Sequence, residues 1–172
     1  MRKARFSKNM TVPALIVAAV IVVIVVALVI GEDKSKPPSR TDIANSACGP
    51  YRDDKNVTIG KQTIKAEVPR TAAAQAKGLG GRPCILPNQG MLFVFSKAGQ
   101  YAFWMKDMRF PIDILWINPD HKVVGQEIDV EPNTYPDRFV NKPENPAQYV
   151  LELKSERSRE LGVNLGTPVS IE

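Results

Sequence analysis

Five residues of this chain have side chains suited to ligand chemistry: Arg82, Trp104, Lys106, Asp113 and Glu152. The two acids are unusual, because Asp113 stands in an apolar run and Glu152 in another. An isolated buried charge is costly, so each carboxylate needs a cation or several hydrogen-bond donors. The sequence therefore predicts that both acids have specific partners.

Two interpretations of these residues stay open. In the first, all five converge on a pocket for a polar ligand, with Lys106 or Arg82 in salt-bridge reach of Asp113. An enzymatic version makes Asp113 and Glu152 the acid–base pair of a small hydrolase or lyase. In the second, Asp113 caps a turn or accepts backbone N–H groups, Lys106 and Glu152 are surface residues, and Trp104 is core.

Metal and cofactor chemistry is not expected. His121 is the only histidine and lies in a predicted turn, 118–121, so a zinc site would lack ligands. The sequence contains no nucleophile-elbow, Cys-x-x-Cys or phosphate-loop pattern. Cys48 and Cys84 form a disulfide, or Cys48 is free in a linker while Cys84 is a small buried apolar residue.

The N-terminal part is predicted to anchor the protein. Residues 1–11 are a basic cytoplasmic tail, and residues 12–30 form an uncharged run long enough to cross a bilayer. The positive-inside rule then places the C-terminal part outside the cytoplasm. A cleaved signal peptide is the alternative, although its apolar region is normally shorter, roughly 7–15 residues. Residues 31–56 are polar and proline-containing, which predicts a linker.

The net charge of +5 does not indicate nucleic-acid binding. Four basic residues and no acid lie in the first ten positions, whereas residues 57–172 are nearly neutral, with fourteen basic and thirteen acidic residues. A nucleic-acid-binding domain is expected to carry its own basic face.

Residues 57–172 are predicted to form a mainly β domain, a compact antiparallel sandwich or barrel-like fold with two short helices. The expected elements follow from turn signals and periodicity. They are a hairpin over 57–68 with a turn at 60–61, a helix over 72–77, strands over 91–95, 101–106, 112–117, 123–130, 149–153 and 168–171, a helical turn over 155–161, and a proline-containing loop over 131–146.

Short motifs in this region resemble the family named domain of unknown function 192 (DUF192). They are Gly78-Leu79 with Arg82, Gly90–Phe93, Phe103–Lys106, Pro111–Ile114, Tyr149–Leu153 and Leu161–Gly166. The resemblance covers about residues 57–172 and implies a mostly β, often exported or membrane-anchored domain with no established activity. Asp107-Met108 stands where the family usually has Asn-Thr.

The sequence thus favours a single-pass membrane protein whose outer domain is a non-catalytic binding or envelope-associated module. Its expected partners are the membrane, through residues 12–30, and a polar ligand or envelope component. The alternatives are the hydrolase or lyase described above and an assembly scaffold, which would expose a large apolar patch.

Overall fold

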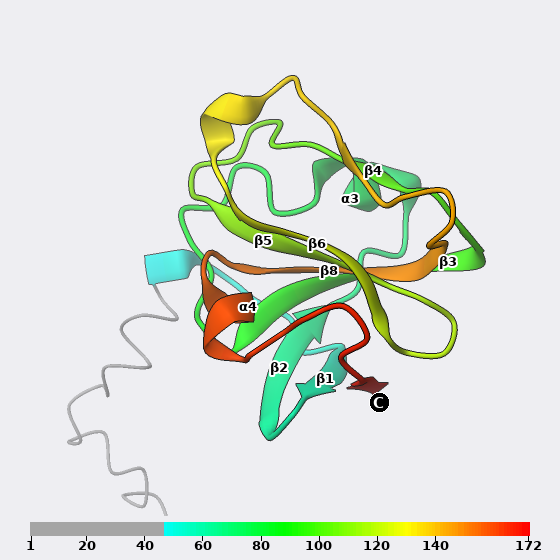
Figure 1. The fold of residues 1–172 in the computed structure, drawn as a ribbon. Coiled ribbons are helices and arrows are strands. Elements are labelled where there is room, and N and C mark those ends of the chain that lie inside the picture. Colours follow the sequence, from blue (N-terminus) through cyan, green and yellow to red (C-terminus); the bar gives the residue numbers. More distant parts are fainter. Residues whose placement is uncertain (1–46) are drawn as a thin grey trace, which may run out of the picture. The chain divides into compact units, whose positions relative to one another are not determined.

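The protein is represented by a computed structural model, which describes residues 47–172 (Figure 1). The fold of these residues is mainly β, with two short α-helices, and confirms the predicted class. The strands are β1 (Lys55–Ile59), β2 (Gln62–Glu67), β3 (Gln89–Gly99), β4 (Ala102–Phe103), β5 (Ile112–Ile117), β6 (Val123–Val130), β7 (Phe139–Val140), β8 (Ala147–Lys154) and β9 (Val169–Ile171). The helices are α3 (Ala72–Lys77), α4 (Arg157–Glu160) and the 3₁₀ turn η1 (Pro132–Thr134).

Seven strands form one sheet in the order β6-β5-β8-β3-β2-β1-β9. Every neighbouring pair is antiparallel except β2 and β3. The sheet is thus mainly antiparallel, and its one parallel pair requires the long crossover that contains α3. The outer strands also approach one another, since Lys122 before β6 forms a bridge with Pro168 before β9. The sheet is therefore curled in a barrel-like way.

The central strands are covered on both faces, so their side chains belong to two cores. Along β5, Leu115 and Ile117 pack in the core enclosed by the curled sheet, while Ile114 and Trp116 pack in a second core outside it. Successive strand residues point to opposite faces, which explains why all six residues of β5 are buried. Figure 1 shows α3 and β4 above the central strands and β1 and β2 below them.

Local sequence signals placed several elements correctly. The hydroxyl of Thr71 accepts a hydrogen bond from the Ala74 N–H at 3.1 Å and begins α3, and Gly78 ends it with φ of 51°. Gly60, with φ of 60°, makes the β1–β2 turn. In the predicted turn at 118–121, the His121 N–H donates to the Asn118 carbonyl at 3.0 Å.

The predicted strand over 101–106 is mostly wrong. Only Ala102 and Phe103 pair with another strand, and their partner is the two-residue β7 in the loop after β6. Prolines in that loop, which lack an N–H, leave little backbone for a longer ladder. The rest of the segment is irregular chain lying over the second core, where Met105 is buried.

The predicted linker extends too far toward the C-terminus. Residues 48–56 belong to the domain: Cys48 forms a disulfide with Cys84, with their Cα atoms 4.9 Å apart. The Tyr51 hydroxyl lies between β2 and β3, donating to the carbonyl of Lys65 or Gly90 and accepting from the Gly90 N–H at 2.8 Å. The polar residues that predicted a linker instead hydrogen-bond to the sheet.

No helix within residues 47–172 has the length and apolar character needed to cross a membrane. The predicted anchor at 12–30, the tail at 1–11 and most of the predicted linker lie outside the described residues.

Candidate functional site

Glu152 lies in the middle of the sheet with its side chain in the second core. On β8 it is opposite Met91 of β3 and Ile114 of β5, so apolar strands flank it on both sides. Only 5% of the residue is exposed. Its Oε2 atom is fully buried and has no hydrogen-bond partner among the described residues. The prediction of an ordinary surface role for Glu152 is wrong.

Burial raises the pKa of Glu152 from 4.5 to about 8. Burial is the sole cause, because no basic side chain or N–H group stands close enough to favour the charged form. At neutral pH this carboxyl is therefore mainly protonated, and it has an O–H that can be donated to a bound molecule.

A pocket of about 330 Å³ opens onto this carboxyl. Its size falls within the range of small-molecule sites, roughly 300–1,000 Å³. Its wall is formed by the end of α3, by β3 and by the segment after it. Its lining includes Ala76, Lys77, Gly78, Phe93, Phe95, Tyr101, Phe103, Trp104, Lys106 and Glu152.

Gly78 lines this pocket next to Phe93 and Glu152. A Cβ atom built there would lie 3.6 Å from the Cζ of Phe93 and 3.7 Å from Oε2 of Glu152. The ring and the carboxyl thus both lie beside Gly78. A larger residue there would contact both of them and would also be strained by the left-handed φ of 51°.

The wall over 101–104 is held in place by two buried polar side chains. The indole N–H of Trp116 donates to the Tyr101 carbonyl at 2.8 Å. Asn141 accepts from the Tyr101 N–H at 2.9 Å and donates to the Gly99 carbonyl at 3.0 Å. These contacts fix an irregular segment that has almost no strand pairing of its own.

Trp104 stands at the pocket rim and is not a core residue. It is 38% exposed, and the guanidinium of Arg138 lies 4.9 Å from its ring centroid. Tyr135 contacts it edge-on, with 6.4 Å between the ring centroids. Both partners come from the loop after β6, which contributes to the surroundings of the pocket as well as to β7.

Asp113 does not take part in this pocket. It is opposite Leu153 on β8, so it points to the other face of the sheet from Glu152. Its carboxylate accepts three backbone N–H groups, from Asp129 at 2.9 Å, Glu156 at 3.0 Å and Ser158 at 2.7 Å. The predicted pairing with Lys106 or Arg82 is wrong, and an Asp113/Glu152 acid–base pair is excluded by their opposite faces.

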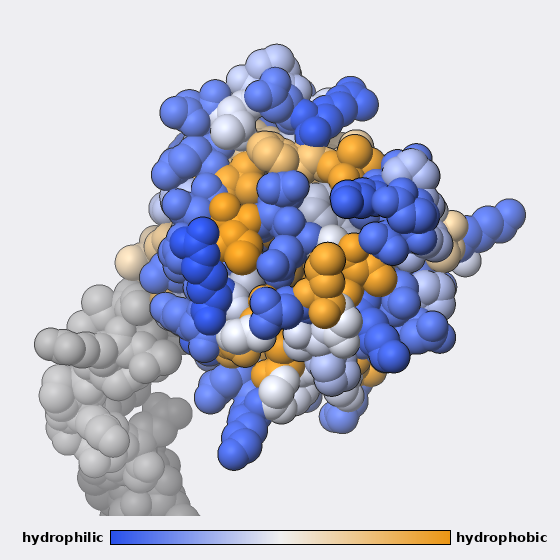
Figure 2. All heavy atoms as spheres, viewed as in Figure 1, coloured by the Kyte–Doolittle hydropathy of each residue, from blue (hydrophilic) through white to orange (hydrophobic). Residues whose placement is uncertain are grey.

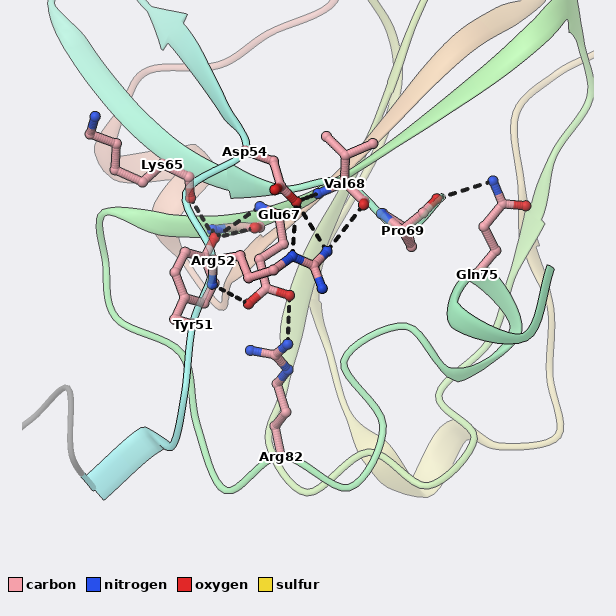
Figure 3. Close-up of polar contacts among 10 residues, drawn as sticks. Tyr51, Arg52, Asp54, Lys65, Glu67, Val68, Pro69, Gln75 and Arg82 are labelled. Atoms are coloured by element: carbon pink, nitrogen blue, oxygen red, sulfur yellow. Dashed lines mark hydrogen bonds and ion pairs between the residues drawn. The ribbon is translucent and has the colours of Figure 1, made fainter. Parts of the chain in front are cut away.

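Arg82 pairs with a different acid (Figure 3). Its guanidinium lies 2.7 Å from Oε2 of Glu67, and the backbone N–H of Arg52 donates to Oε1 of Glu67 at 2.7 Å. The guanidinium also lies 5.7 Å from the ring centroid of Tyr51. This partly buried network attaches the start of the domain to β2. The role of Glu67 was missed because its partners are distant in sequence.

The structure thus brings together three of the five predicted residues, Trp104, Lys106 and Glu152. The residues that sequence reasoning missed are Gly78 and the aromatic wall from Phe93 to Phe103. Alternation along β3 places Phe93 and Phe95 on one face of the sheet. This alternation was the sequence signal from which the aromatic wall could have been predicted. A larger cavity of about 600 Å³ lies elsewhere, beside His121 and Tyr149, but contains no buried polar atom without a partner.

Within residues 47–172 no three His, Cys, Asp or Glu side chains gather as metal ligands. The His121 ring packs edge-on against Tyr149, with 5.2 Å between ring centroids.

Residues 55–171 match the model of the family DUF192, described as an uncharacterized ACR. The match covers well over half of the chain, so this protein belongs to that family. The resemblance predicted from the motifs is confirmed, and the match begins two residues before the predicted boundary.

Two solved structures share the fold. A candidate transcription regulator from Sinorhizobium meliloti is 26% identical with a TM-score of 0.63, covering 71% of this chain and 97% of the other. A protein of unknown function from Novosphingobium aromaticivorans is 28% identical with a TM-score of 0.60, covering 67% and 83%. The chain matches no curated protein.

Proposed function

We propose that the domain is a non-catalytic binding module that takes a small ligand into the pocket above Glu152. The observation that carries this proposal is the buried Oε2 atom without a partner at an open, aromatic-walled cavity. Buried polar groups in folded proteins are nearly always hydrogen-bonded, so an exception facing a cavity favours a bound partner. Catalysis would need a second positioned group with a separated pKa, and the acid expected to supply it faces away.

We also propose that residues 12–30 tether this module to a membrane, with the domain outside the cytoplasm. The uncharged run and the basic residues before it support this topology. The Cys48–Cys84 disulfide supports it too, because such bonds persist mainly in oxidising compartments.

The scaffold alternative receives less support. On the face shown in Figure 2, apolar surface is divided into small areas by hydrophilic residues. A docking surface for assembly is expected to be larger and continuous.

The binding function is tested by filling the pocket mouth. Ala76 and Ala73 are both exposed residues of α3, but only Ala76 lines the pocket. The full chain in detergent is screened by thermal shift against envelope sugars, peptides and amines, and each hit is repeated with Ala76→Phe and Ala73→Phe. Ligands of this site lose binding in Ala76→Phe alone. The proposal fails if no compound shows that difference.

A further inference from the structure

The carboxyl of Glu152 lines the pocket, and its Oε2 atom has no hydrogen-bond partner among the described residues. The basic residues lining the pocket are Lys77 and Lys106, and neither forms an ion pair with Glu152. Arg82 is engaged by Glu67 on another part of the domain. Among residues 47–172, therefore, no cation satisfies this carboxyl.

Aromatic rings line the same pocket. The ring of Phe93 reaches within 3.6 Å of the point that a Gly78 Cβ would take, and Oε2 of Glu152 lies 3.7 Å from that point. Phe103 packs edge-to-face on Phe93, with ring centroids 4.8 Å apart. A carboxylate combined with aromatic rings is the combination that proteins use to bind ammonium groups, through charge pairing and cation–π attraction.

We propose that the pocket binds an amine, with a primary or methylated ammonium group placed between Glu152 and Phe93 and an apolar body against the outer aromatic wall. This inference rests on the proposed binding function and names its ligand class. Phe95 and Tyr101, stacked with ring centroids 3.5 Å apart, and the rim residue Trp104 supply that outer wall.

The basic residues at the pocket rim would by themselves favour a different class of ligand. Lys77 and Lys106 would attract a carboxylate or a phosphate, and they are exposed. Exposed lysines are flexible and hydrated, so a charge at the rim contributes little. The buried carboxyl of Glu152 determines the ligand class more strongly than these lysines do. An unpaired buried polar group destabilises the fold, and a bound partner would remove that cost.

Amine binding must be coupled to a proton. In the empty pocket Glu152 is mainly protonated below about pH 8, because burial raises its pKa to about 8. The other titratable groups lining the pocket are Lys77 from α3, and Tyr101 and Lys106 from the segment after β3; Met91 and Ile114 on the neighbouring strands are apolar. An incoming ammonium favours the carboxylate, so Glu152 loses its proton to solvent as the ligand binds.

The test uses three probes that share one aromatic body: phenethylamine, 2-phenylethanol and 3-phenylpropionate. Each is titrated calorimetrically into the full chain in detergent, in two buffers of different ionisation enthalpy. Near pH 6.5 phenethylamine should release close to one proton per molecule bound. Its affinity should rise about tenfold per pH unit up to about pH 8 and then level off, because the carboxylate fraction follows that course.

Glu152→Gln keeps the size of the side chain and removes its charge, so it should weaken phenethylamine at least tenfold and abolish the pH dependence. Glu144→Gln, at an exposed position outside the pocket lining, is the matched control and should change neither. If Glu152→Gln does not fold, the amine proposal is tested by the proton release and by the pH dependence of phenethylamine affinity in the natural chain.

Three results would overturn the amine proposal: tighter binding of 3-phenylpropionate, equal binding of 2-phenylethanol, or an affinity that falls with rising pH. If phenethylamine does not bind while other compounds bind in an Ala76-dependent way, the ligand class is wrong and the binding function stands. If no compound distinguishes Ala76→Phe from Ala73→Phe, both proposals fail.

Discussion

Glu152→Gln should make the domain more stable at high pH and should leave its stability almost unchanged at low pH. The buried carboxyl has a pKa of about 8 in the folded protein against 4.5 for an unperturbed glutamate. At about 1.4 kcal/mol per pH unit, this difference corresponds to about 5 kcal/mol of folding free energy. The magnitude is large because desolvation of the carboxylate is not offset by any hydrogen bond to Oε2.

The sign follows from proton uptake. The folded state holds the Glu152 proton more tightly than the unfolded state, so rising pH destabilises the fold. The stabilising contribution is fully present below about pH 4.5 and is lost progressively until about pH 8. Glutamine resembles the protonated acid and does not titrate, so the variant does not lose this stability as the pH rises.

The assay is equilibrium denaturation, without reductant, of the natural sequence and the variant across about pH 5 to 8. The free energies of unfolding should diverge by about 3 to 4 kcal/mol over that range, with the variant more stable at the upper end. Subtracting one protein from the other cancels every other titrating group. A difference that stays constant with pH would show that the Glu152 carboxyl has a partner or reaches water, and would refute the reasoning.

Three further outcomes are expected. Asp113→Asn should destabilise the domain by about 3 kcal/mol or more in chemical denaturation, because an amide cannot accept from three backbone N–H groups; Asp120→Asn, in an exposed turn, should cost under about 0.5 kcal/mol. Replacing both Cys48 and Cys84 by serine should cost about 4 kcal/mol in the chain-entropy model, seen as a lower denaturation midpoint; an unchanged midpoint would contradict it. A reporter fused after Glu172 should be active outside the cytoplasm, and activity only inside would reverse the proposed topology.

The elements that the sequence predicted well are those specified by neighbouring residues. Helix α3 has its bounds set by the Thr71 cap and by Gly78, and β5 and β6 are bounded by a proline-containing turn. In each case the signal and the element lie within a few residues of one another. Local hydrogen bonds and turn geometry then suffice to place the boundary.

Features that depend on distant contacts could not be predicted in the same way. The partner of Arg82 is Glu67, fifteen residues earlier, and the donors to Asp113 come from two other elements. Tyr51 lies in a stretch whose composition is that of a linker, yet its hydroxyl hydrogen-bonds with the backbone of β2 and β3. Composition reports only average polarity, whereas the register between strands decides which polar groups meet.

The contrast between Asp113 and Glu152 shows why register matters for function as well. The two acids are adjacent in the β5–β8 ladder, since Asp113 is opposite Leu153 and Ile114 is opposite Glu152. Both are buried, but one lies on each face of the sheet. Asp113 receives three N–H donors and fastens α4 and β6 to the sheet, whereas Oε2 of Glu152 receives none.

A carboxyl that served the fold alone could be replaced on β8 by an apolar residue of similar size, and the domain would become more stable. Sites where a protein breaks the rule of satisfied buried polar groups are expected to be functional or strained, and at a functional site the cost is offset when the partner binds. Glu152 adjoins the pocket and Asp113 does not. The same pair of strands therefore provides a structural acid on one face and a binding acid on the other.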